Sequence, residues 1–237
     1  MTEIDDHIHE CEISFTRSQV YGLLARIFSS SDQVLDNTLL RDLGRVTSET
    51  SDYVELDDDL ACIKEAIRAI APTVREMNQE YTRLFSKGEA PPYECSYVPS
   101  SRVTHELADI SGFFLAFGVQ PKGERQDNLS SELEFMSFLC LKESIAQSNQ
   151  MLEEAKICRD AQTKFLTDHL GRWIGVHHRL VRDKTNFPIY PLLVGLVHKI
   201  VTRDASYLGA RIDEIIEVPI DEAQDLPGCG IGSNSIC

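Results

Sequence analysis

The residues best suited to chemistry lie in the segment 80–97, "EYTRLFSKGEAPPYECSY". It begins with helical spacing, breaks at a glycine, and after two adjacent prolines places Tyr93, Glu94, Cys95 and Tyr97 close together. The prolines restrict the backbone, so the side chains that follow lose less conformational entropy on binding. Aromatic faces accept apolar side chains or arginine, and a carboxylate pairs with a cation. The pattern therefore indicates a peptide-binding loop. The alternative is a well-packed crossover loop that binds nothing.

A second polar cluster lies at the start of a helix that the apolar spacing predicts from residue 129 onward. Its members are charged or hydrogen-bonding residues: Glu124, Arg125, Asp127, Asn128, Ser130 and Glu132. Either Asn128 or Ser130 can cap the helix, and Glu132 can reach back to its first turn as in a capping box. A helix start also attracts anions, and a carboxylate-rich patch suits a basic partner. The cluster is interpreted either as a helix cap or as part of a partner-binding site.

No motif for catalysis or metal binding is present in the sequence. It lacks a Walker loop, a dinucleotide-binding glycine pattern, a zinc-protease helix motif and a nucleophile elbow. His177 and His178 are adjacent, so they face different sides of a helix and are predicted at the surface or its boundary. His105 and Asp109 share a helix face, but no third ligand is within sequence reach. We therefore expect no enzymatic activity, no metal and no cofactor.

Charge and cysteine usage narrow the choice of partner and compartment. The formal net charge of −15 repels nucleic acid and attracts basic peptides, although it also simply favours solubility. The N-terminus has no apolar signal-peptide core, and the most apolar stretch, residues 187–201, is too short to span a membrane. Seven scattered cysteines without a CxxC pair are typical of reduced thiols. A cytoplasmic protein without stable membrane insertion is predicted.

Helical spacing dominates the chain, and no strand pattern of useful length appears. The predicted helices cover residues 20–28, 33–44, 60–70, 72–85, 102–119, 129–140, 152–170, 172–183, 190–204 and, as a short tenth helix, 205–216. The prediction is an all-α fold: a single helical-bundle domain of about nine to ten helices over residues 1–217, with a long crossover loop near residues 86–102. Residues 218–237, which carry Cys229 and Cys237, are predicted to be an irregular or disordered tail.

Four short stretches, in this order, resemble one protein family. They are "EYTRLF" (80–85), "PYECSY" (92–97), "DNLSSELEFM" (127–136) and "FLTDHLGRW" (165–173). Over roughly residues 17–205 the chain resembles the TorD/DmsD-type redox-enzyme maturation chaperones, a group that includes the NarJ-like assembly factors. The stretch "LEFMSFLCLKE" (133–143) is most similar to the branch that serves type II enzymes of the dimethyl-sulfoxide (DMSO) reductase family.

The resemblance implies an all-helical, non-enzymatic, cytoplasmic chaperone. Such a protein holds the apo catalytic subunit of a molybdopterin enzyme until cofactor insertion, and many members bind that subunit's twin-arginine (Tat) signal peptide. A monomer or a domain-swapped dimer would fit the family. The implied partner-binding residues are Tyr81, Leu84, Phe85, Pro92, Tyr93, Glu94, Cys95, Tyr97, Glu124, Asp127, Asn128 and Glu132. Leu84 and Phe85 have helical apolar spacing that fits core packing equally well.

The sequence departs from the family pattern at two of these positions. Cys95 stands where the family has serine, and Asn128 stands where it has histidine. Asparagine keeps a hydrogen-bond donor and acceptor but does not titrate in the physiological range, and cysteine is a weaker hydrogen-bonding group. Two alternatives stay open. One is a small-molecule, nucleotide or cofactor-precursor binding protein that uses the 86–102 loop as its pocket. The other is a thiol-based sensor that uses Cys95 and the tail.

Overall fold

The chain is described here by a computed structural model, and its architecture is all-helical. The structure describes residues 3–29, 37–48, 56–70, 73–86, 88–120 and 125–218. These contain no β-strand, only one isolated β-bridge. The predicted all-α class is therefore confirmed. Within the described ranges no helix is both long and apolar enough to cross a membrane.

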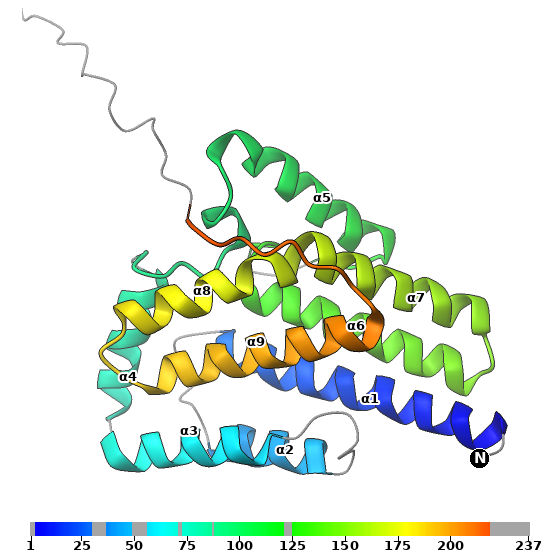
Figure 1. Cartoon of the computed structure of the whole chain (residues 1–237), viewed down its shortest axis with the longest axis horizontal. Coiled ribbons are helices and arrows are strands. Elements are labelled where there is room, and N and C mark those ends of the chain that lie inside the picture. The colour runs from blue at the N-terminus through cyan, green and yellow to red at the C-terminus, as the bar shows by residue number, and fades with distance from the viewer. Residues whose placement is uncertain are drawn as a thin grey trace, which may run out of the picture.

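Nine α-helices occur in the described ranges, in agreement with the predicted nine to ten (Figure 1). They are α1 (Glu3–Phe28), α2 (Asn37–Ser48), α3 (Asp57–Ile70), α4 (Val74–Tyr81), α5 (Val103–Ala116), α6 (Leu129–Ser148), α7 (Leu152–Phe165), α8 (Gly171–Lys184) and α9 (Ile189–Leu208). Two π-helical turns, η1 (Thr82–Ser86) and η4 (Leu166–Leu170), extend α4 and join α7 to α8. The loop between α4 and α5 carries two 3₁₀ turns, η2 (Glu94–Ser96) and η3 (Ser100–Arg102).

Helices α1 and α6 form the most extensive pairing of the bundle, and they run antiparallel. Small side chains allow the close approach: the Ser137 hydroxyl donates to the Ser18 carbonyl at 2.7 Å, and a Cβ atom at Gly22 would lie 3.1 Å from Ser137 Oγ. Helix α7 packs on α6, α9 packs on α8, and α2 and α3 cover α1 and α9 respectively (Figure 1). Helix α5 stands at the outside of the bundle.

A buried ionic network ties four of these helices together. The Arg17 guanidinium on α1 has no exposed surface and donates to Asp204 on α9 at 2.6 and 2.8 Å. It also contacts Glu143 on α6 at 3.3 Å and Gln162 on α7 at 2.6 Å. Because an unpaired buried charge is strongly destabilising, this network favours one arrangement of the helices. The site residues are therefore held on a well-fixed scaffold.

The predicted tenth helix is wrong. Gly209 adopts a left-handed conformation with φ of 70° and ends α9, and residues 210–218 continue as an irregular strap along α8. The Ile215 N–H donates to the Arg172 carbonyl at 2.8 Å, and a Cβ atom at Gly171 would lie 2.4 Å from Ile212 Cδ1. Ala210, Ile212 and Ile215 therefore pack on the core from a strap without helical structure, whereas Ile216 is exposed. The predicted tail lies outside the described residues apart from Val218, so the domain division at residue 217 stays a prediction.

Candidate partner-binding site

The structure brings the two polar sequence clusters into direct contact. Tyr93 and Asn128 form the isolated antiparallel bridge, and the Glu94 N–H donates to the Asp127 carbonyl at 2.9 Å. The loop after α4 and the start of α6 are thus joined through their backbones, as a shared site requires. Glu124 lies outside the described residues.

Asp127 is the buried centre of this junction. Its carboxylate is fully shielded from solvent and accepts a bidentate pair of hydrogen bonds from Arg125, at 2.9 and 2.8 Å. The Cys95 N–H donates to the same carboxylate at 3.3 Å. The Arg125 guanidinium, whose side chain is 54% exposed, lies 4.7 Å from the centroid of the Tyr93 ring. Arg125 and Tyr93 therefore form a cation–π pair at the surface, held in place from below by Asp127.

Asn128 caps α6, as one reading of the sequence predicts. Its Oδ1 accepts from the Ser130 N–H at 2.9 Å and from the Ser130 hydroxyl at 2.8 Å. The predicted capping box is wrong. With Asn128 as the cap, the third helical position is Ser131, so Glu132 lies one residue too far along to reach back. Glu132 instead points inward, and its Oε2 accepts from the Trp173 indole N–H at 3.0 Å.

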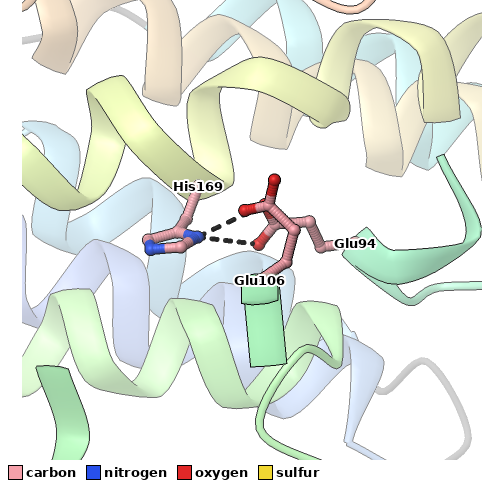
Figure 2. Close-up of side chains that lie close together, drawn as sticks. All are labelled: Glu94, Glu106 and His169. Carbon is pink, nitrogen blue, oxygen red and sulfur yellow. Dashed lines mark hydrogen bonds and ion pairs between the residues drawn. The ribbon is translucent and has the colours of Figure 1, made fainter. Parts of the chain in front are cut away.

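Glu94 points into the protein and meets a histidine from the η4 turn. The two Glu94 carboxylate oxygens, Oε2 and Oε1, lie 3.1 and 3.3 Å from His169 Nδ1, and both side chains are fully buried (Figure 2). The other ring nitrogen, Nε2, lies 3.3 Å from Asp109 Oδ2 on α5. Burial, which outweighs the attraction of His169, raises the pKa of Glu94. The loop is thereby fixed to the α7–α8 junction.

Glu132 and Glu94 form a coupled pair of buried acids. Burial raises the pKa of Glu132 well above its ordinary value, and the charge of Glu94 raises it further. Burial, together with like charges in a shared low-dielectric site, disfavours double ionisation, which is why the pKa values of both carboxyls shift upward. The sequence offered no local carboxylate pair because these two residues are far apart along the chain.

An aromatic stack closes the inner side of the loop. The Tyr97 ring lies parallel to Trp173 with centroids 5.5 Å apart, and its hydroxyl contacts both the Pro91 carbonyl and His177 Nδ1 at 2.8 Å. A carbonyl only accepts, so the hydroxyl donates to Pro91 and His177 Nδ1–H donates to the hydroxyl oxygen. The prediction that His177 lies at the surface or its boundary is wrong, because it is fully buried; His178 is half-buried. Burial lowers the pKa of His177 to about 3.

The residues at the end of α4 act as supports for the loop. The Tyr81 hydroxyl donates to the Phe28 carbonyl at 3.1 Å, and Leu84 and Phe85 are buried in the core. The Phe85 ring meets Tyr81 edge-to-face at a centroid distance of 4.9 Å and Tyr190 at 5.7 Å. These contacts agree with the core-packing alternative for Leu84 and Phe85.

The expectation that the loop after α4 presents its polar and aromatic side chains to a partner is largely wrong, because most of them point inward. Glu94, Cys95 and Tyr97 are 0%, 9% and 1% exposed, Pro92 is buried, and Tyr93 is half-buried. The physical reason is that polar partners for the inward side chains are supplied by η4 and α8, so their burial leaves them hydrogen-bonded. Burial also raises the pKa of the Cys95 thiol, which opposes a role as a reactive thiolate.

The predicted site list lacked several residues that the structure places there. His169 and Trp173 stand in the stretch "FLTDHLGRW", which carries the family resemblance, so a signal for them was present in the sequence. Glu106 and Asp109 of α5 gave no such signal, because only the fold brings α5 next to η4. Arg125 was recognised as a cluster member, but its pairing with Tyr93 depends on the bridge between the two segments.

Comparison with known proteins places this geometry in a family context. A family model described as nitrate reductase delta subunit matches residues 50–178, a range that contains the loop, the start of α6 and the η4 turn. A curated relative, the "Perchlorate reductase assembly chaperone protein" of Dechloromonas aromatica (strain RCB), is 28% identical over 145 residues. The alignment covers 60% of this chain and 61% of that protein, so the chain spans less than two thirds of the relative's length.

Proposed function

The chain belongs to the nitrate reductase delta subunit family, and from this premise we propose that it is an assembly chaperone for the catalytic subunit of a molybdopterin-containing oxidoreductase. In this role it binds the cofactor-free catalytic subunit and releases it after cofactor insertion. It catalyses no reaction itself, in keeping with a relative whose name describes an assembly chaperone.

The observation that supports this proposal most is the junction of the two sequence clusters. The Tyr93–Arg125 pair is an aromatic and planar cationic surface, fixed from beneath by the buried Asp127 carboxylate. Tyrosine and arginine are enriched at the energetically dominant positions of protein interfaces, because tyrosine gives a large, rigid contact area and arginine a planar group with several hydrogen-bond donors. A rigid pair of this kind suits recognition of a folded or partly folded polypeptide.

The proposal also includes a specific ligand, the twin-arginine signal peptide of the catalytic subunit. The net charge of −15 attracts a basic segment and speeds its encounter. The Asp127 carboxylate, however, already holds Arg125 in a bidentate pair, so a guanidinium from the peptide must displace Arg125 or bind elsewhere. The Tyr93 ring offers a second position, since a guanidinium can stack on it. Cytoplasmic location and a type II enzyme of the DMSO reductase family as client belong to the same proposal.

Co-purification tests the chaperone proposal directly. The chain is tagged, expressed in its native host as the only tagged protein, and purified through the tag. It should retain a large molybdopterin-enzyme subunit, which mass spectrometry identifies. Deletion of the chain should lower the molybdenum content of that enzyme while its polypeptide is still made. The proposal is contradicted if no such subunit is retained and the molybdenum content is unchanged.

The catalytic subunit with and without its leader shows whether the chain binds the signal peptide or the mature subunit. If the signal peptide is the main determinant, removal of the leader from the catalytic subunit should abolish retention. If retention is unchanged without the leader, the mature subunit is the ligand and the signal-peptide part of the proposal is wrong.

A further inference from the structure

Three side chains from separate parts of the chain converge below the loop. Glu94 of η2, Glu106 of α5 and His169 of η4 each offer one oxygen or nitrogen atom, and these atoms lie within 4.8 Å of one another (Figure 2). All three residues are buried, at 0%, 2% and 0% exposure. No metal site was predicted from the sequence, because Glu94, Glu106 and His169 are too far apart along the chain to form a local ligand pattern.

The surroundings of His169 resemble those of a metal-binding histidine. Histidine ligands commonly direct one ring nitrogen to the metal and the other to a carboxylate that orients the ring. Here Nδ1 faces the Glu94 carboxylate at 3.1 Å, while Nε2 lies 3.3 Å from Asp109 Oδ2 without hydrogen-bond geometry and has no hydrogen-bond partner among the described residues. When the proton is on the Asp109 side, Nδ1 and the Glu94 oxygens are all acceptors. A proton or a cation must then lie between them.

Buried atoms without hydrogen-bond partners also leave room for a cation. Arg102 and Arg172 lie 2.7 and 3.5 Å from Glu106 Oε1, yet within the described residues this buried oxygen accepts no hydrogen bond and so remains available as a ligand. Close by, Glu132 Oε1 is a buried acceptor without a hydrogen-bond partner in the described part of the chain. Buried acceptors of this kind are costly unless a proton, a water molecule or an ion satisfies them.

We propose that Glu94, Glu106 and His169 bind one divalent first-row metal ion, with Zn²⁺ as the best fit to one imidazole and two carboxylates. Such ligands bind Zn²⁺ at about 2.0 to 2.2 Å, so small side-chain rotations suffice to close the site. The ion lies between the Glu94 oxygens and the His169 ring, and any proton that it displaces there leaves to solvent. It links the loop, α5 and the α7–α8 junction, and therefore fixes the underside of the Tyr93–Arg125 surface. The proposal is independent of which partner the chain binds.

Metal titration of the full-length chain tests the proposal. The parent protein for this experiment carries Cys229→Ser and Cys237→Ser, which remove the tail thiols. It is stripped of metal with a chelator and then titrated with ZnCl₂ by calorimetry. Mass spectrometry counts the bound zinc. We expect one equivalent, and a dissociation constant at least about 100-fold weaker in His169→Gln and in Glu106→Gln. The matched control is His105→Gln, which removes an exposed histidine next to Glu106 and should bind as the parent does.

Two results would overturn the proposal. One is equal zinc affinity in His169→Gln and its parent, which would assign the ion to thiols or surface groups. The other is the absence of saturable binding at pH 8, which would mean that the cluster holds a proton only. Circular dichroism checks the fold of each variant. If the variants do not fold, anomalous diffraction from zinc-soaked crystals of the parent decides: density among the three side chains supports the site, and density only elsewhere refutes it.

Discussion

Glu132 is fully buried, with one carboxylate oxygen bound to the Trp173 N–H and its pKa raised chiefly by burial. In the unfolded chain a glutamate titrates near its ordinary pKa of about 4.3. Above that pH the native state therefore keeps a proton that the unfolded state releases. The stabilising contribution of Glu132 is complete below about pH 4 and is lost as the pH rises toward its folded pKa.

Glu132→Gln should therefore stabilise the protein increasingly at higher pH. Glutamine is neutral at every pH and keeps an oxygen acceptor for Trp173. The difference in unfolding free energy between the variant and wild type should grow by up to about 1.4 kcal/mol per pH unit above pH 5, until the folded pKa is reached. Urea denaturation at pH 5 and pH 8 measures it, with the exposed Glu134→Gln as control. A pH-independent difference would show that Glu132 is ionised in the native state.

His177 should give the opposite pH dependence. Burial lowers its folded pKa to about 3, while an unfolded histidine titrates near pH 6.5. Between these values only the unfolded state binds the proton, so stability is complete above about pH 6.5 and is lost as the pH falls. From pH 6.5 to pH 5 wild type should lose about 2 kcal/mol relative to His177→Gln, in which the amide can still donate to Tyr97. Parallel stability curves for the two proteins would refute this.

The start of α6 is the element on which the site is built. Asn128 both caps this helix and forms the bridge to Tyr93, and the cap uses its side chain whereas the bridge uses only its backbone. These two roles can be separated by substitution, because a serine side chain caps about as well as asparagine.

Asn128→Ala should lower the unfolding free energy by about 1 kcal/mol, since the Ser130 N–H loses its acceptor. Asn128→Ser should stay within a few tenths of a kcal/mol of wild type, because it restores the cap. Thermal or urea denaturation measures both variants. If serine is as damaging as alanine, the contribution of this position does not come from capping.

The helical spacing of apolar residues predicted the number and order of the helices well, because the apolar faces of α3, α4 and α9 are regular. It failed at residues 205–216, where the left-handed Gly209 ends α9 and Ile212 and Ile215 pack on the core from an irregular strap. It also missed that α1 begins as early as Glu3, because the polar N-terminal sequence carries little apolar periodicity.

The candidate site could be predicted only in part, because its side chains come from distant parts of the chain. The motifs identified the loop and the start of α6, and the structure joins these through Tyr93 and Asn128. Which side chains point inward could not be predicted, because the partners of Glu94 and Tyr97 are His169 and His177, 75 and 80 residues further along the chain. The predicted partner-binding roles of the individual residues remain predictions.

For the whole molecule, buried polar and aromatic contacts hold the helices and the loop after α4 together. The Arg17 network holds α1, α6, α7 and α9 together, and the Glu94–His169 and Tyr97–Trp173 contacts hold the loop on that frame. Most of the predicted site residues therefore make contacts inside the protein. The surface that we propose for another polypeptide centres on Tyr93 and Arg125, within a strongly acidic protein.

The most direct test is the affinity of the chain for the cofactor-free catalytic subunit that co-purifies with it, measured by calorimetry for wild type, Tyr93→Ala, Arg125→Ala and Arg68→Ala. Arg68 is an equally charged, exposed arginine on α3 and serves as the control. We predict that Tyr93→Ala and Arg125→Ala each weaken binding at least about tenfold, the size expected for central interface residues, while Arg68→Ala leaves it unchanged. Unchanged affinity in both site variants, with their helical content intact, would contradict the account.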